Sequence, residues 1–290
     1  MNVIISGGTG YLGSHLVRAM VDLGWHVTVM ARPSSRCDLL GDVLDSVNLI
    51  KIAHVDGAFA AVDSVDIVVH AATCYGRNGE SASEMLHANV VLPLQILNCA
   101  VDHGAYMFCN TDTILRRHTN QYSLSKKQFL EWLHLITAGG TIRATNIVLD
   151  QFYGPGQACD SFIPWLVRQC LTNTEILLTV GSQRRRFLYI DDLVNAYMMA
   201  IQAAVATKTP FQEFQIGSVQ PNSVSEVVEL VHSLSGSRAK LCFGAIPPRN
   251  HELNESRMDL TSIRALGWEE HVSLDAGLSA VVDFERGLMH

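Results

Sequence analysis

Tyr122 and Lys126 form the pair of residues whose types and spacing point most directly to chemistry. They lie four positions apart in "NQYSLSKKQF" (120–129), and on a helix this spacing puts both side chains on one face. A phenol has a pKa of about 10, and a neighbouring ammonium group favours the phenolate and brings that pKa nearer to working pH. Tyr122 would then give a proton to a carbonyl oxygen or take one from an alcohol. The alternative is the solvated side of an ordinary helix, which is what we expect for Lys127.

A glycine-rich turn forms a second candidate site at the start of the chain. The stretch "SGGTGYLGSH" (6–15) follows a short apolar run and precedes a helical pattern. Glycines in such a turn let the backbone approach a pyrophosphate, and the helix N-terminus offers N–H groups and the positive end of its dipole. The context predicts dinucleotide binding, and the alternative is a tight turn without a ligand. The predicted cofactor-binding residues here are Gly7, Gly10, Tyr11, Leu12 and Gly13.

The end of the second predicted strand indicates which dinucleotide binds. NAD enzymes with this kind of turn usually carry Asp or Glu there, which accepts a hydrogen bond from the ribose 2′-hydroxyl. Here residues 30–36 read "MARPSSR", without an acid. Arg32, Ser35 and Arg36 would suit a 2′-phosphate, because guanidinium groups pair well with phosphate oxygens. We therefore predict NADP(H) as the cofactor, against the alternative of a solvated basic loop.

The elements that must position these residues are apolar strands that alternate with helices. Continuous apolar runs predict buried strands, and this alternation indicates a parallel sheet covered by helices on both faces. Thr111 ends one strand, and its hydroxyl could bind the same substrate oxygen as Tyr122. His70 ends another and is expected to be a structural histidine. The predicted strands are 3–6, 26–31, 65–72, 105–111 and 141–149; the predicted helices are 11–24, 82–104 with a kink at Pro93, and the one that carries Tyr122.

The second half of the chain has a looser pattern. Helices are predicted at 162–172, 191–206 and 223–235, separated by turn-rich segments. No flexible linker precedes them, so we expect the second half to pack on the first and form a cleft with it. Asp191 and Asp192 are expected to be N-cap and dipole partners of a helix rather than catalysts.

Composition excludes several classes of function. The chain has 290 residues and a net charge of −7, which argues against nucleic acid or an anionic membrane as the main partner. Its seven cysteines form no CxxC pair, and its histidines show no metal-ligand spacing, so neither a disulfide framework nor a metal site is predicted. There is no leader-like segment and no apolar run long enough to span a bilayer, so the cytoplasm is the expected compartment.

The order of motifs resembles the extended short-chain dehydrogenase/reductase family of nucleotide-sugar enzymes. Within that family the chain is most similar to the synthases of CDP-3,6-dideoxyhexoses, in "NTD" (110–112), "FIPW" (162–165) and "FGAIPPRNHE" (243–252). The resemblance covers essentially the whole chain. Its motifs are "GGTGYLG" (7–13), "DIVVHAA" (66–72), "HANVVLPLQIL" (87–97), "NTDT" (110–113), "YSLSK" (122–126), "YGPGQ" (153–157), "RRFLYIDDLVNAY" (185–197) and "LGW" (266–268).

The resemblance implies a Rossmann domain for residues 1–150, with 186–217 packing back onto it, and a smaller α/β substrate domain from 151–185 and 218–290. It implies a catalytic trio of Thr111, Tyr122 and Lys126, with Lys126 also holding the nicotinamide ribose. A homodimer through helices near 84–103 and 122–138 is implied as well. The remaining implied contacts are Ala71 and Ala72 to the cofactor, Thr73, Tyr75 and Asn89 to the substrate, and Arg185 and Arg249 to the nucleotide diphosphate.

Two departures from the family pattern bear on the reaction. The loop from Thr111 to Tyr122 is short, and Thr113 follows Asp112 where related 4,6-dehydratases carry Glu, so water elimination would lack its acid/base. The sequence therefore favours an NADPH-dependent reductase of a nucleoside-diphosphate 4-keto-6-deoxy sugar. The alternatives are a 4-epimerase with tightly bound NAD and an NADP-binding sensor or scaffold without catalytic activity.

Overall fold

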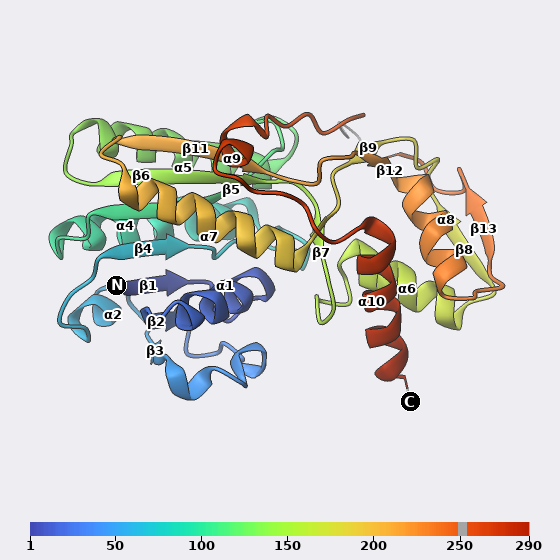
Figure 1. Ribbon diagram of the computed structural model, residues 1–290, viewed down its shortest axis with the longest axis horizontal. Coiled ribbons are helices and arrows are strands. Elements are labelled where there is room, and N and C mark those ends of the chain that lie inside the picture. The colour runs from blue at the N-terminus through green and yellow to red at the C-terminus, as the bar shows by residue number, and fades with distance from the viewer. Residues whose placement is uncertain (249–253, 290) are drawn as a thin grey trace. The chain divides into compact units, whose positions relative to one another are not determined.

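Two units make up the chain, and the computed structural model describes residues 1–248 and 254–289 of it (Figure 1). Unit 1 comprises residues 1–149, 194–215 and 261–268, and unit 2 comprises 150–193, 216–260 and 269–290. The segment that returns to the first unit is therefore shorter than the expected 186–217. Residues 261–268, which were expected in the substrate domain, group with unit 1 instead.

A seven-stranded sheet forms the centre of unit 1, in the order β3-β2-β1-β4-β5-β6-β11. The pairs from β3 through β6 are all parallel, which confirms the predicted Rossmann-type fold. Two strands, β3 and β11, were not predicted from the sequence, because β3 has no run of buried apolar residues and β11 alternates with polar ones. The strands are β1 (Asn2–Ser6), β2 (His26–Ala31), β3 (Asn48–Lys51), β4 (Ile67–His70), β5 (Met107–Thr113), β6 (Arg143–Leu149) and β11 (Phe211–Ile216).

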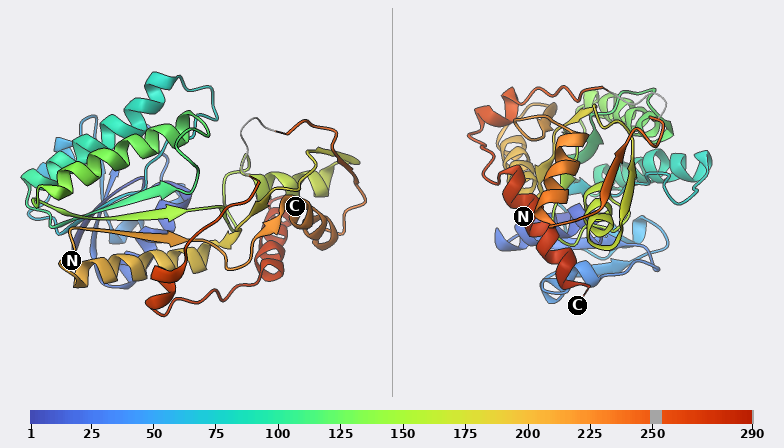
Figure 2. Two further views of the ribbon diagram at one scale, coloured as in Figure 1. Left: turned by 90° about the horizontal axis from the view of Figure 1, so that it is seen from above. Right: turned by 90° about the vertical axis from the view of Figure 1, so that its right-hand side faces the viewer.

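Helices cover both faces of this sheet: α4 and α5 lie on one face, and α1 and the later part of α7 lie on the other (Figure 2). On the first face Phe108 of β5 packs with Phe129 of α5 in a large apolar cluster that also takes in Leu97 of α4. The helices of unit 1 are α1 (Tyr11–Asp22), α2 (Asp56–Ala60), α3 (Ala82–Leu86), the π-helical turn η3 (His87–Val91), α4 (Leu92–Asp102), α5 (Gln121–Ala138) and α9 (Thr261–Ala265), together with most of α7 (Ile190–Ala206) and the 3₁₀ turns η1 (Asp38–Leu40) and η2 (Leu44–Ser46).

The predicted kink at Pro93 takes the form of a π-helical turn. Pro93 lies in the first turn of α4, and η3 directly precedes it. Proline cannot donate to the carbonyl four residues earlier, which belongs to Asn89, and its ring would crowd that carbonyl. A widened turn relieves this conflict. It also sets where Asn89 lies, at the end of the sheet where β4 stops.

Unit 2 has its own apolar core, formed by three helices together with short two-stranded sheets. Leu166 of α6, Val231 of α8 and Leu278 of α10 are buried together in it. Asp192 lies in the first turn of α7 together with Asp191, as expected of a partner for the helix dipole. Its carboxylate also accepts hydrogen bonds from the backbone N–H groups of His271 (3.1 Å) and Val272 (2.8 Å), so it anchors that segment as well. The elements are α6 (Phe162–Thr172), α8 (Val224–Leu234), α10 (Leu274–Gly287) and the strand pairs β7 (Phe152–Tyr153) with β10 (Leu188–Tyr189), β9 (Arg184–Arg185) with β12 (Asn222–Ser223), and β8 (Glu175–Leu178) with β13 (Lys240–Phe243).

Candidate active site

The order of strands reverses between β1 and β4, and the glycine turn lies at that point. Ligands of doubly wound sheets bind beyond the carboxyl ends of the strands at such a reversal. Gly7 follows β1 with φ +80°, and a Cβ there would lie 2.4 Å from the backbone nitrogen of Ala72, which follows β4. The predicted cofactor residues Gly7, Ala71 and Ala72 are therefore brought together by backbone contact. His70 fixes the same region, since its Nδ1 lies 2.7 Å from the Ser6 hydroxyl oxygen.

The N-terminus of α1 fits a dinucleotide phosphate. Gly10 is the N-cap and gives no side-chain hydrogen bond, and the first turn of α1 holds no acidic residue. The helix therefore keeps N–H groups and the positive end of its dipole for a ligand. A Cβ on Gly13 would lie 2.0 Å from the Gly7 carbonyl oxygen, so glycine is needed for the helix to start this close to the turn.

The basic loop after β2 presents one uncommitted guanidinium. Arg32 is exposed, and no hydrogen bond or ion pair of its guanidinium occurs in the described parts of the chain. Ser35 is bonded to the Arg32 backbone, since its hydroxyl oxygen accepts from the Arg32 N–H at 3.2 Å. Arg36 pairs with Asp38 at 2.6 Å, but both side chains are strongly exposed, and such pairs contribute only ~0–1 kcal/mol. Arg32 is thus the better placed of the two for a phosphate.

Tyr122 and Lys126 lie one turn apart near the start of α5, as their spacing predicts. The start of this helix is fixed by a capping box: the Asn120 side chain accepts from the Ser123 N–H at 2.8 Å, and the Ser123 hydroxyl oxygen accepts from the Asn120 N–H at 3.1 Å. Tyr122 is half-buried, whereas Lys126 is only 2% exposed. Local hydrogen bonding thus places the phenol in the first turn and the ammonium group beneath it.

The Tyr122 phenol does not titrate as the sequence predicts. Burial raises the pKa of the Tyr122 phenol well above its usual 10.0, and the neighbouring Tyr75 and Asp112 raise it further, while hydrogen bonds from Thr113 and Thr73 act against the rise. The expected lowering by Lys126 is therefore wrong for the protein alone. Burial also lowers the pKa of Lys126 to about 8, with Asp112 opposing and Lys127 assisting. At neutral pH Tyr122 is thus a neutral phenol that can donate a proton.

Asn89, a predicted substrate contact, is fully committed to the fold. Its side-chain oxygen accepts from the Cys74 N–H at 2.8 Å, and its amide donates to the Cys74 carbonyl at 2.8 Å and to the Ser125 hydroxyl at 3.0 Å. Thr73 also donates to it, at 3.3 Å. Asn89 is 0% exposed, so it ties the loop after β4 to α5 and has no face left for a substrate.

Tyr75, in contrast, lies at the surface beside Tyr122. Its ring lies 5.0 Å from the Tyr122 ring, centroid to centroid, and the Arg77 guanidinium lies 4.7 Å from the centroid of the Tyr75 ring.

The two predicted diphosphate contacts are Arg185 and Arg249. Arg185 lies in β9 of unit 2 and is mostly buried, and its Nη1 donates to the Arg184 carbonyl at 2.8 Å. Arg249, the other predicted diphosphate contact, lies outside the described residues.

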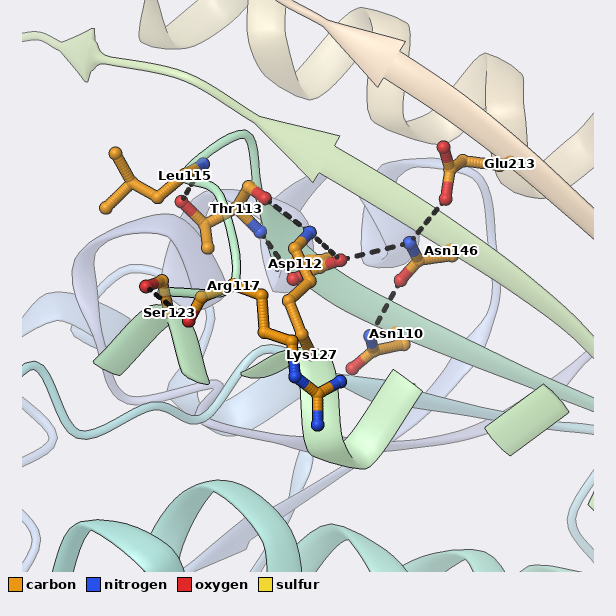
Figure 3. Close-up of polar contacts among 9 residues, drawn as sticks. All are labelled: Asn110, Asp112, Thr113, Leu115, Arg117, Ser123, Lys127, Asn146 and Glu213. Carbon is orange, nitrogen blue, oxygen red and sulfur yellow. Dashed lines mark hydrogen bonds and ion pairs between the residues drawn. The ribbon is translucent and has the colours of Figure 1, made fainter. Parts of the chain in front are cut away.

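Lys127 is not the solvated neighbour that its spacing predicted. Its ammonium group donates to the Asp112 carboxylate and to the Thr113 carbonyl oxygen, each at 2.7 Å (Figure 3). The side chain of Asp112 is 0% exposed, so the ion pair supplies the charge that a buried carboxylate requires. Asn146 lies on the other side of Asp112 and donates to it at 3.3 Å and to Glu213 at 2.9 Å. Sequence reasoning missed this network because its residues come from three strands and a helix.

Thr111 turns toward α7. Its hydroxyl lies 2.8 Å from the hydroxyl of Tyr197. The Tyr197 side chain is fully buried, and its hydroxyl oxygen also accepts a hydrogen bond from the Cys109 thiol at 3.4 Å.

In the described residues, no cluster of three or more His, Cys, Asp or Glu side chains could hold a metal ion. No helix there is both long and apolar enough to span a bilayer.

The fold and site define an NAD(P)-dependent enzyme of the oxidoreductase type, with a dinucleotide turn after β1 and a tyrosine-lysine pair on α5. The match of residues 3–217 to the model of the NAD dependent epimerase/dehydratase family shows that the chain belongs to this family. It is 24% identical to CDP-abequose synthase of Salmonella muenchen over 98% of both chains. It is 28% identical to dTDP-4-dehydro-6-deoxy-D-allose reductase of Streptomyces bikiniensis over 81% of both. Among solved structures, UDP-glucuronic acid 4-epimerase from Bacillus cereus has the same fold, with TM-score 0.86 at 20% identity and coverage of 99% of this chain and 100% of that one.

Proposed function

We propose that the protein reduces the C4 keto group of a nucleoside-diphosphate 4-keto-6-deoxy sugar with NADPH. The observation that carries the proposal is that Tyr122 lies one turn before the buried Lys126 at the start of α5, the helix that follows the carboxyl end of β5. Both relatives are named for deoxysugar nucleotides, and one of them is a reductase. Arg32, whose exposed guanidinium has no partner among the described residues, and the absence of an acid at the end of β2 favour NADP over NAD.

In the proposed reaction, a bound reduced nicotinamide supplies the hydride. Tyr122, protonated in the resting protein because burial raises the pKa of its phenol, donates its proton to the oxygen at C4. Lys126 holds the nicotinamide ribose hydroxyls, and no hydrogen bond in the described residues competes for its ammonium group. By resemblance, Thr111 is the second donor to that oxygen, and Arg185 and Arg249 bind the diphosphate.

The second candidate within the family is a nucleotide-sugar 4-epimerase, and the structural relatives that carry NAD keep it open. An epimerase oxidises and re-reduces the same carbon, so its tyrosine must also act as a base. Because the pKa of Tyr122 is raised, little phenolate is present to act as a base without help from another group. Arg32 favours NADP, which a reductase must release and rebind in each cycle. A sensor or scaffold would have no need of the Tyr122–Lys126 pair.

Exposed apolar side chains support a homodimer through α5 and the helices beside it. Trp132 and Leu135 of α5 are 48% and 67% exposed, and Leu86 at the end of α3 is 44% exposed.

We propose the cytoplasm as the compartment of the protein. All seven cysteines lie in the described residues and none of them forms a disulfide, which is typical of a reducing compartment.

Tyr122→Phe tests the proposed chemistry. Loss of a positioned acid should lower turnover by roughly 10²–10⁴-fold, while NADPH affinity, measured by quenching of the nicotinamide fluorescence, stays within about twofold. The matched control is Tyr106→Phe, on the same unit but away from the site. If Tyr122→Phe turns over like the parent protein, Tyr122 is not the acid.

A further inference from the structure

An aromatic ring stands next to Tyr122 on the loop that follows the carboxyl end of β4. It belongs to Tyr75, whose ring centroid lies 5.0 Å from that of Tyr122, with the two rings tilted by 41°. Tyr75 is 43% exposed, so part of its ring remains open to a ligand. The residue therefore forms one border of the space around the Tyr122 phenol.

The loop that carries Tyr75 is bonded to the helix that carries Tyr122. Asn89 accepts from the Cys74 N–H and donates to the Cys74 carbonyl, each at 2.8 Å. The amide of Asn89 also donates to the Ser125 hydroxyl of α5 at 3.0 Å. The residue directly before Tyr75 is thus tied to α5, and the fold itself sets where the Tyr75 ring lies relative to Tyr122.

Arg77 holds the Tyr75 ring from the other end of a glycine turn. Its guanidinium carbon lies 4.7 Å from the ring centroid, a distance at which a cation is attracted to an aromatic face. No hydrogen bond or ion pair of this guanidinium occurs in the described parts of the chain. Gly76, between the two residues, has φ +72°, and a Cβ there would lie 2.3 Å from the Met85 Cε. The turn that lets Arg77 reach the ring therefore requires glycine.

The position of this ring has a consequence for the sugar. A sugar reduced at C4 must bring its C4 oxygen within roughly 3 Å of the Tyr122 hydroxyl. C3 and C5 are bonded to C4, so the groups that they carry lie against the residues beside Tyr122. An aromatic ring packs well against a methyl or methylene group. A hydroxyl pressed against the ring loses its water without gaining an equivalent partner.

We propose that Tyr75 is a specificity-determining residue that favours a 4-keto sugar with an apolar group next to C4, and that Arg77 is the positioning residue that holds the Tyr75 ring in place. This inference rests on the proposed function. The apolar group is either the methyl group that C5 carries in a 6-deoxy sugar or a methylene at C3. Arg77 acts only through Tyr75.

Three nucleoside-diphosphate 4-keto sugars test the role of Tyr75 through kcat/KM with NADPH: a 6-deoxy sugar, its 6-hydroxyl counterpart and its 3-deoxy counterpart. An apolar contact discriminates against an added hydroxyl by roughly 10- to 100-fold, and we expect the parent protein to prefer the less hydroxylated sugar of at least one pair to this extent. That pair shows whether the ring borders C6 or C3. Tyr75→Asn should reduce the preference to about threefold or less, whereas Tyr75→Phe keeps the ring and should keep the preference.

Three results would overturn the role of Tyr75. They are a parent protein without preference in either pair, a preference that Tyr75→Asn leaves unchanged, and a preference that Tyr75→Phe loses as fully as Tyr75→Asn. The last result would assign the selection to the hydroxyl of Tyr75 instead of its ring.

A double-mutant cycle tests the role of Arg77. Arg77→Met should weaken the same preference, Arg77→Lys should restore part of it because an ammonium group also binds an aromatic face, and Arg77→Met should add nothing to Tyr75→Asn. Losses that multiply would show that Arg77 does not act through Tyr75. The parent protein separates the two proposals: if it oxidises NADPH with none of the three sugars, the proposed function fails. If it reduces them at C4 and Tyr75→Asn keeps the parent's preference, only this inference fails.

Discussion

Replacing Lys126 with methionine should stabilise the protein without its cofactor while destroying its activity. Burial lowers the pKa of Lys126 from 10.5 to about 8. A difference of one in pKa corresponds to about 1.4 kcal/mol, so keeping this ammonium group charged inside the fold costs about 3 kcal/mol at pH 7 relative to the unfolded chain. Methionine has a similar length and no charge, and Lys126 is 2% exposed, so its site is already closed around the chain.

The pH dependence of stability supplies the assay. A lowered pKa means that the unfolded chain binds the proton more tightly between pH 8 and 10.5. In that window the parent protein therefore gains stability as the pH rises, relative to Lys126→Met. Calorimetric midpoints without cofactor should thus favour the variant by several degrees at pH 7 and by little or nothing above pH 10. Saturating NADPH should stabilise the parent more than the variant, since the ligand adds its binding free energy only where it binds.

A variant that is less stable than the parent at pH 7, or a difference that does not change with pH, would refute this reasoning. Either result would mean that Lys126 is charged and well paired in the fold. Lys127→Met is the matched control, because that lysine is paired with Asp112 and its removal should destabilise at the same pH.

The other predictions concern the cofactor, the loop after β4 and the dimer. Arg32→Ala should weaken NADPH binding by roughly tenfold or more and leave NADH binding unchanged. Arg36→Ala should have a smaller effect, because the Asp38 carboxylate beside that guanidinium offsets part of its charge. Titration of both cofactors measures these affinities, and equal losses for NADPH and NADH in Arg32→Ala would contradict the prediction. Asn89→Ala leaves the Cys74 backbone groups without their partners and should lower the free energy of unfolding by roughly 3 kcal/mol, measured by urea denaturation; a loss below about 0.5 kcal/mol would contradict it. Trp132→Arg should shift the sedimentation of the protein toward the monomer, and an unchanged sedimentation coefficient would contradict the proposed dimer face.

The strands and helices of unit 1 were largely predictable, because its central strands are buried on both faces. Strand β2 was predicted with the same bounds as observed, from the largely apolar stretch 27–31. Strand β3 was missed, since none of its residues is buried. The dinucleotide turn was also predictable. Side chains at Gly7 and Gly13 would clash with nearby backbone atoms, so both positions require glycine, and this requirement is visible in the sequence as a glycine motif.

The polar part of the site was not predictable to the same depth. Helical spacing placed Tyr122 and Lys126 on one face, but it says nothing of Lys127, whose partners Asp112 and Thr113 belong to a strand more than ten residues away. The pKa of Tyr122 also depends on burial, which no spacing reports. For Asn89 the motif predicted a substrate contact, but it could not report the hydrogen bonds to Cys74 and Ser125, which come from other segments of the chain.

The stoichiometry of cofactor use tests the central claim most directly. The purified protein is offered nucleoside-diphosphate 4-keto-6-deoxy sugars with CDP, UDP, GDP or dTDP as the nucleotide, together with NADPH, and nicotinamide absorbance is followed beside the sugar product. The account predicts that one NADPH is oxidised for each sugar reduced at C4, and that little nucleotide cofactor remains on the protein after purification. A protein that retains NAD through purification and interconverts two C4 epimers without net oxidation of cofactor would contradict it.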